Sequence, residues 1–252
     1  MSEATEAEAA SDPSGANRAR LTPANLVAEA RRAVDALPSY QVRLDRQERV
    51  GPKLQDRESV LLSIRRSPKA VRIEWPSGPH KGREVLFARG DGPDVMHVNM
   101  PGALVPRITL PINSPLALRN SRHPIDEAGL ESLVTTMERW IEDAPSQAQY
   151  EGGEIPPSYG KPCLKLVFKG NDGEVRVVHL DARTRLPALV RVTAPNGELL
   201  EDYGFLEIRT DCPELAGAEA FDPTSRWGAA KGLLSKRKVV EPGTPEEPDP
   251  NR

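Results

Sequence analysis

Alternation of apolar and polar positions dominates the middle of the chain. In the first such run, Tyr40, Val42 and Leu44 share one face, and the polar residues between them share the other. A period of two is typical of a half-buried β-strand, whose successive side chains point to opposite faces. The same pattern predicts nine strands, at residues 40–45, 60–64, 70–75, 84–88, 94–98, 163–169, 174–181, 188–194 and 198–209. Short turns rich in Gly, Pro or Asn separate them, which favours antiparallel hairpins.

Two segments have the apolar spacing of amphipathic helices instead. The first begins with Thr22 as N-cap and Pro23 in the first helical position, and we expect it to run to about Leu37. Its apolar residues are Leu26, Val27, Ala30, Val34 and Leu37. The second begins near Asp126, which we expect to be its N-cap. Its apolar face carries Leu130, Leu133, Val134, Met137 and Ile141.

The order of these elements predicts an α+β, β-dominated fold. We expect a strongly curved antiparallel sheet, shaped as an incomplete barrel, with helices covering its concave face, because a sheet with one apolar face must bury that face. Strands that alternate so regularly are half-solvated, which excludes a doubly wound parallel sheet. One domain is expected over residues 21–227. Residues 1–20 and the Pro- and Glu-rich residues 228–252 are predicted to be disordered tails.

Composition argues against several classes of function. The net charge is −3 and only 4% of the residues are aromatic, which argues against a nucleic-acid-binding protein. No stretch approaches the about 20 apolar residues of an integral membrane segment. The first residues lack the basic start and apolar run of an export signal. The sequence therefore leaves the compartment open, with the cell envelope or periplasm expected if the start is truncated.

Side chains that often carry chemistry are scattered. The four histidines have no metal-binding spacing, and no nucleophile elbow, phosphate-binding loop or dinucleotide motif is present. We therefore expect no enzyme, no metal and no cofactor, and we expect a monomer. Cys163 and Cys212 form no CxxC pair. Two buried free thiols are the simpler interpretation, and a disulfide between strand ends, formed in an oxidising compartment, is the alternative.

Several segments resemble a known bacterial family. Gln47-Glu48-Arg49, the RRSP run at residues 65–68, Trp75 and the segment NSPLALRNSRHPI at residues 113–125 resemble the domain of unknown function 1571. The resemblance is carried by motifs over residues 22–150 and by pattern alone over residues 160–210. This family is similar to the LolA-like lipoprotein carriers, whose incomplete barrel holds acyl chains on its concave face. The resemblance thus implies a curved sheet and, in most family members, export from the cytoplasm.

The concave face is the expected binding surface. It would be lined by Val42, Leu44, Leu62, Ile64, Ile73, Trp75 and Phe87. We expect a non-enzymatic binding module that holds an apolar ligand, either a lipid or a lipoprotein acyl chain, or a partner's hydrophobic segment. The alternative is a structural or protein-interaction scaffold whose sheet face is filled by its own helices. A cavity of roughly 300–1,000 Å³ between sheet and helices would favour the binding module.

Charged residues suggest two further features. Arg119, Arg122 and His123 precede the second helix and could form an anion site near its N-terminus. The alternative is a packed loop whose cations meet carbonyls or acidic side chains. Arg46 and Glu48 continue the apolar face of the first strand, which indicates a buried ion pair or the polar floor of a cavity, unless the strand leaves the core after Leu44.

Overall fold

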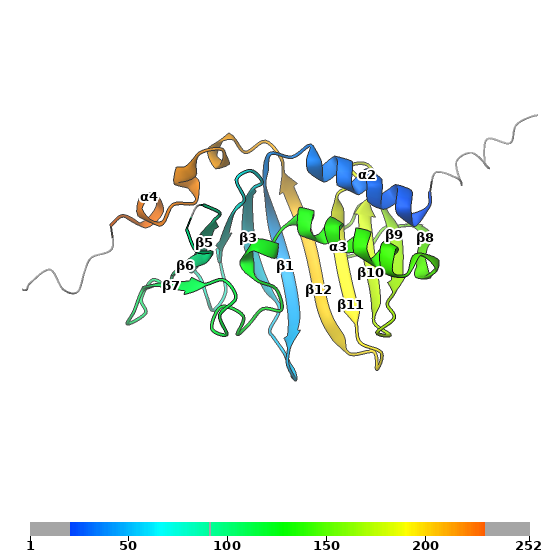
Figure 1. Ribbon diagram of the computed structural model, residues 1–252, viewed down its shortest axis with the longest axis horizontal. Helices are drawn as coiled ribbons and strands as arrows, with labels where there is room; N and C mark the ends of the chain where they lie inside the picture. The colour runs from blue at the N-terminus through cyan, green and yellow to red at the C-terminus, as the bar shows by residue number, and fades with distance from the viewer. Residues whose placement is uncertain (1–20, 91, 230–252) are drawn as a thin grey trace, which may run out of the picture.

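The computed structural model describes residues 21–90 and 92–229. One part of the sheet is built from β1 (Ser39–Val50), β2 (Lys53–Leu54), β3 (Glu58–Arg65), β4 (Ala70–Glu74), β5 (Glu84–Ala88), β6 (Val95–Asn99) and β7 (Arg107–Pro111). The other part is built from β8 (Ala148–Glu154), β9 (Cys163–Lys169), β10 (Val175–Asp181), β11 (Pro187–Thr193) and β12 (Leu199–Arg209). All twelve strands belong to a single antiparallel sheet (Figure 1).

The two halves of the sheet meet at β1 and β12. The strand order is β7-β6-β5-β4-β3-β1-β12-β11-β10-β9-β8, with β2 paired to β1 alone. Leu44 at the centre of β1 lies opposite Val60 of β3 on one side and Phe205 of β12 on the other. The two ends of this order, β7 and β8, are not paired with each other, so the sheet is not closed into a barrel. The predicted β-dominated antiparallel fold is confirmed.

Two helices cover one face of this sheet, α2 (Pro23–Asp35) and α3 (Leu130–Asp143) (Figure 1). The hydroxyl oxygen of Thr22 accepts a hydrogen bond from the backbone N–H of Asn25 at 3.2 Å, so the predicted N-cap of α2 is confirmed. The remaining turns and helices are short: η1 (Ile125–Glu127), η2 (Pro145–Gln147), η3 (Pro213–Leu215), η4 (Ala218–Ala220) and α4 (Pro223–Trp227). Over the described residues, none of the helices has the length and apolar character needed to cross a membrane.

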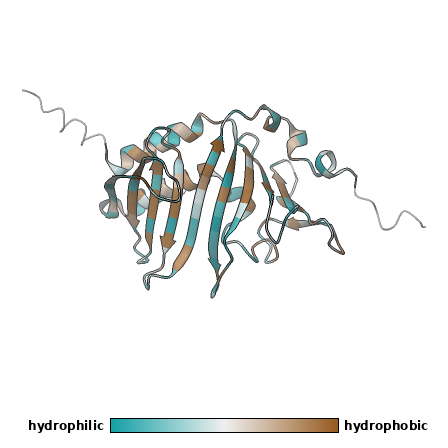
Figure 2. Ribbon diagram, turned by 180° about the vertical axis from the view of Figure 1, so that it is seen from behind, coloured by the Kyte–Doolittle hydropathy of each residue, from teal (hydrophilic) through white to brown (hydrophobic). Residues whose placement is uncertain are grey.

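The main core lies between α2, α3 and the concave face of the sheet. The apolar residues of α2 at positions 26, 27, 30 and 34 are buried against inward residues of the strands, which include Tyr40, Leu62 and Phe87. Apolar and polar residues alternate along the strands when the sheet is seen from the opposite face (Figure 2). A second, smaller core gathers around Phe221, where η3 and η4 pack against Ala70 of β4.

The start of α3 differs from the prediction. Asp126 is not its N-cap, because residues 125–127 form the separate turn η1 and the N-cap position belongs to Gly129. Gly129 has a φ of +111°, a conformation that interrupts the helical path between the two elements. The first backbone N–H of α3, that of Leu130, donates to the Tyr40 hydroxyl oxygen at 2.7 Å. A side chain from β1 thus replaces the expected local cap.

The sequence also led to predictions for the two cysteines and for the two ends of the chain. Cys163 and Cys212 are both buried and free, so the disulfide alternative is wrong. Burial raises the pKa of Cys163 to about 11, which keeps this thiol protonated. Of the tails predicted at residues 1–20 and 228–252, residues 1–20 and 230–252 lie outside the described residues, and the single-domain boundaries stay a prediction.

Candidate functional site

A cavity of about 390 Å³ lies between the concave face of the sheet and the start of α3. Strands from both halves of the sheet form its walls, since Leu62 of β3 and Val190 of β11 both line it. The loop at residues 112–124, together with η1 and α3, closes the side opposite the sheet. The helices therefore fill only part of the concave face, and the volume falls within the range of small-molecule sites.

One wall of the cavity is apolar. Its residues come from six neighbouring strands and the turn after β4: Leu44, Leu62, Ile73, Trp75, Val85, Met96 and Phe205. Of the seven residues predicted to line the binding surface, Leu44, Leu62, Ile73 and Trp75 lie on this wall. The other three, Val42, Ile64 and Phe87, lie within the core and are fully buried. The alternation of the strands did not show where the helices stop covering this face, and a binding role for the seven residues stays a prediction.

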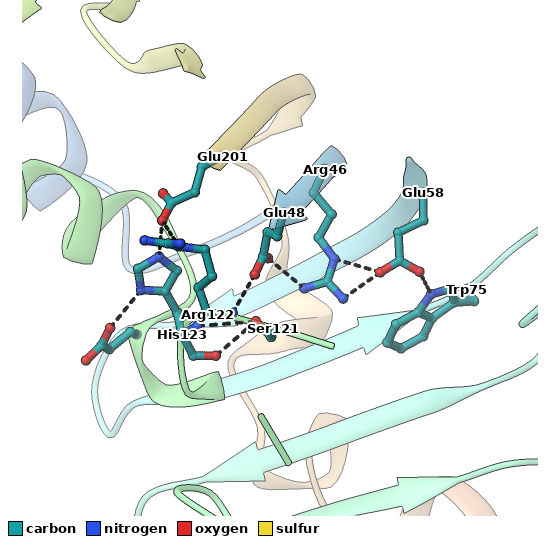
Figure 3. A network of polar contacts seen from close by, with 9 residues as sticks. Arg46, Glu48, Glu58, Trp75, Ser121, Arg122, His123 and Glu201 are labelled. Atoms are coloured by element: carbon teal, nitrogen blue, oxygen red, sulfur yellow. Dashed lines mark hydrogen bonds and ion pairs between the residues drawn. The ribbon is translucent and has the colours of Figure 1, made fainter. Parts of the chain in front are cut away.

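The same face of the sheet also carries a row of charged side chains, which forms the charged wall of the cavity (Figure 3). The Arg46 guanidinium of β1 donates from Nε and Nη2 to one carboxylate oxygen of Glu58, at 2.8 and 2.6 Å. The second Glu58 oxygen accepts from the indole N–H of Trp75 at 2.6 Å. Arg46 Nη1 also lies 3.6 Å from Glu48 Oε1. Arg46 and Glu48 also line the cavity. The sequence suggested a buried ion pair or the polar floor of a cavity, and the two side chains combine both features.

A second group of charges ties the covering loop to the sheet (Figure 3). Glu48 accepts a hydrogen bond from the backbone N–H of Arg122 at 2.6 Å. The neighbouring strand supplies Glu201, which accepts from Arg122 Nε at 2.7 Å and lies 3.1 Å from His123 Nε2. Glu48 and Glu201 lie directly opposite each other on β1 and β12. Two carboxylates in such a position repel each other, and the cations of the loop offset that repulsion.

The pKa values follow from this pairing. Burial alone would raise the pKa of Glu58, but the charge of Arg46 and the hydrogen bond from Trp75 outweigh it and lower the pKa. The pKa of Glu201 is lowered in the same way, since the hydrogen bond from His123 and the charge of Arg122 outweigh its burial. The hydrogen bond to Glu201 raises the pKa of His123. Each of these shifts favours the charged form of its group.

The predicted anion cluster is divided by the structure. Arg122 and His123 face Glu201, and His123 Nδ1 lies 3.3 Å from Glu127. Arg119 is exposed and is not part of the cavity wall. The loop thus has the character of the packed alternative, with its cations facing acidic side chains, and anion binding by these three residues stays a prediction.

Other residues of the wall were missed by the sequence analysis. Glu58 and Glu201 give no local signal, because each meets its partner only across the sheet. Arg83, in the turn between β4 and β5, lines the cavity with its guanidinium carbon 4.9 Å from the centroid of the Trp75 ring. Within residues 21–90 and 92–229, no three His, Cys, Asp or Glu side chains gather as a metal site would require.

Fold and cavity together define a curved-sheet protein with a ligand-sized space beneath its second helix. The sequence matches the family described as protein of unknown function DUF1571 over residues 37–226. The chain belongs to this family, and the match extends through the second half, where only a pattern had indicated it. No curated protein matched the sequence.

Solved structures with similar folds were also found. One is a DUF1329 family protein from Desulfovibrio piger, with a TM-score of 0.43 and 14% identity, covering 85% of this chain and 99% of that one. Another is the Mycobacterium tuberculosis lipoprotein LppX, with a TM-score of 0.42 and 15% identity, covering 74% and 98%. A LolA superfamily protein from Nitrosomonas europaea has a TM-score of 0.31 and 10% identity, covering 77% and 96%. The function proposed below rests on the cavity itself.

Proposed function

We propose that this protein is a non-enzymatic binding protein that holds an apolar ligand, such as the acyl chain of a lipid or lipoprotein, in the cavity beneath α3. The observation that carries the proposal is the cavity of about 390 Å³ with one continuous apolar wall. Burying an acyl chain against such a wall is favourable by about 0.8 kcal/mol for each methylene group removed from water. A partner's hydrophobic segment could use the same wall.

The charged wall also suits binding. Arg46 forms an ion pair with Glu58, and Arg122 forms one with Glu201. These pairs fix the shape of the cavity before a ligand binds. A scaffold filled by its own helices is the competing function. The buried face of α2 supports it for the part of the sheet near Val42, but the space under α3 remains unfilled. For the compartment we propose the cell envelope, as the family resemblance implies, to be tested by fractionation of host cells.

Native mass spectrometry of protein purified from its own host tests the binding function. We expect a bound lipid or acyl-bearing molecule as a mass increment that disappears on denaturation. The variant Ile73→Trp should abolish the increment, because Ile73 lines the cavity and the larger ring would occupy the space of the ligand. The control is Ile155→Trp, at a side chain that is 63% exposed, which should retain it. Bare protein from several wild-type preparations would count against the proposal.

A further inference from the structure

Arg83 occupies a defined position in the cavity lining, beside Trp75 of the apolar wall. Its backbone is fixed on both sides, since Arg83 N–H donates to the carbonyl of His80 at 2.9 Å and its carbonyl accepts from Trp75 N–H at 3.0 Å. The guanidinium lies over the indole ring of Trp75, which itself lines the cavity. Strand alternation places Val85, two residues later, on the same wall. A cation and an apolar surface thus lie beside each other in the cavity.

This cation forms no salt bridge with the acidic residues that the structure describes, although the charge of Glu58 acts on it. The other guanidiniums of the wall are paired, Arg46 with Glu58 and Arg176 with Glu174, at 2.6 and 2.8 Å. Arg83 forms no such pair, and its Nε is shielded from solvent without a hydrogen-bond acceptor. Burial lowers the pKa of Arg83, the direction expected for a cation that is poorly compensated. A buried hydrogen-bond donor without an acceptor raises the free energy of the folded protein, and a ligand that supplies the acceptor would lower it again.

We propose that Arg83 binds the anionic head group of a single-chain amphiphile whose apolar tail lies along Ile73, Val85, Met96 and Phe205. This rests on the proposed function and names its ligand class. A planar guanidinium matches the two oxygens of a carboxylate, and it also binds the oxygens of a phosphate. Glu58, whose charge acts on Arg83, is already held by Arg46 and Trp75 and leaves the guanidinium available to a ligand.

The size of the cavity favours one chain over two. A volume of about 390 Å³ lies near the lower end of the range for small-molecule sites. The rest of the charged wall is internally paired, so a head group placed at Arg46 or Arg122 would have to displace a carboxylate. Arg83 is the position at which an anion adds a partner without removing one.

Calorimetric titration of the full-length protein with three twelve-carbon probes tests the inference. Laurate carries a carboxylate, dodecyl phosphate carries a phosphate, and dodecanol carries no charge. We expect wild-type protein to bind at least one anion about tenfold or more tighter than dodecanol, the gain expected from charge-assisted hydrogen bonds. A preference for laurate assigns a fatty acid, and a preference for dodecyl phosphate assigns a phosphate ester. Either result supports the anionic head group.

Variants assign the effect to Arg83. Arg83→Met should reduce the affinity for the preferred anion to that for dodecanol and leave dodecanol binding unchanged. Arg83→Gln repeats the test with a polar side chain, and thermal melting verifies that both variants fold. The matched control is Arg107→Met, because Arg107 also lies over an indole, that of Trp227, but away from the cavity. It should keep the wild-type preference.

Two outcomes contradict the inference and are distinguishable. One outcome is equal affinity for all three probes in wild-type protein, or an anion preference that persists in both Arg83 variants. It would overturn the role of Arg83 without contradicting the binding of an apolar ligand in the cavity. Binding of none of the probes would overturn the proposed function together with it.

Discussion

Charged side chains of neighbouring strands and of the covering loop interact with one another on the concave face. Among these side chains, that of His123 has the ordinary pKa nearest to neutral pH. Its imidazole lies between Glu201 and Glu127 and connects the covering loop to β12. The side chain is 46% exposed, so solvent screens part of the interaction. The loop is therefore held to the sheet by a contact whose strength depends on pH.

His123→Asn should destabilise the protein in a pH-dependent way. The pKa of His123 is raised above its ordinary value of 6.5, so the stabilisation by its protonated form is complete below that value and is lost as pH rises through the folded pKa. The pKa of Glu201 is lowered, so its contribution is lost only toward acid. Thermal melts should thus show the largest difference between wild type and variant near about pH 5.5, and a smaller one near about pH 9.

His97→Asn provides the comparison for this experiment. Burial lowers the pKa of His97, so the folded protein favours its neutral form. Any advantage of the wild-type residue should therefore grow as pH rises, the opposite of His123. A pH-independent difference for His123→Asn would show that the loop is held by packing alone.

The sequence revealed half of this charge arrangement. Arg46 and Glu48 stood out because they continue an apolar face, which is a local property of one strand. Their partners come from strand register: Arg46 lies opposite Glu58, and Glu48 lies opposite Glu201. Register depends on which strands become neighbours, and β1 and β12 are separated by most of the chain. No local pattern reports that pairing.

The start of α3 depends on a contact from a distant strand. The Tyr40 hydroxyl accepts from Leu130 N–H at 2.7 Å and donates to Glu131 Oε2 at 2.9 Å, which closes the first turn of α3. Burial and the charge of Glu131 raise the pKa of Tyr40, so the hydroxyl stays protonated and keeps its proton for this bond. The contact requires close approach of Gly129.

Gly129→Ala should weaken the protein through this contact. A Cβ at this position would lie 2.6 Å from the Tyr40 hydroxyl oxygen, so the hydroxyl would have to move and its bonds to α3 would be lost. Losing a cap costs about 0.5–2 kcal/mol, and the unsatisfied buried hydroxyl raises the expected loss in the free energy of unfolding to about 2–4 kcal/mol. Urea denaturation followed by circular dichroism measures it.

Gly78→Ala separates the contact from backbone strain. Gly78 also has a positive φ, +77°, but an added Cβ would meet nothing within 4 Å. Its substitution should cost only the strain of the left-handed conformation, about 1–2 kcal/mol. Equal losses at the two glycines would mean that the Tyr40 contact contributes little to α3.

Elements with a strong apolar pattern were predictable, and those at the sheet edges were not. The nine predicted strands are all present, whereas β2, β7 and β8 were missed. The edge strand β8 contains Gly152 and Gly153 and a register shift, and β7 ends at Pro111. Edge strands bury little, so their sequences are free to depart from alternation. The cavity was likewise unpredictable, because it depends on where α3 stops covering the strands.

At the scale of the whole molecule, the sheet is continuous through β1 and β12. These two long strands pair with each other over residues 41–48 and 201–209. The two halves of the sheet are therefore joined along the length of this pair. The cavity also takes walls from both halves. One hydrophobic core extends across this junction, from Trp75 on one side to Phe168 on the other. The fold should therefore behave as one cooperative unit.

Two tryptophans report on the two halves and test this expectation. Trp75 lies beside β4, and Trp140 of α3 packs against Phe168 of β9 in a tilted arrangement with ring centroids 5.3 Å apart. With the other two tryptophans changed to Phe, each variant has one fluorescent reporter. In each variant, the urea midpoint from fluorescence should coincide with that from circular dichroism, as expected for two-state unfolding. Trp75→Phe also removes the hydrogen bond to Glu58 and should lower both midpoints together. A Trp140 signal lost well before the circular dichroism signal would show instead that the second half of the sheet unfolds on its own.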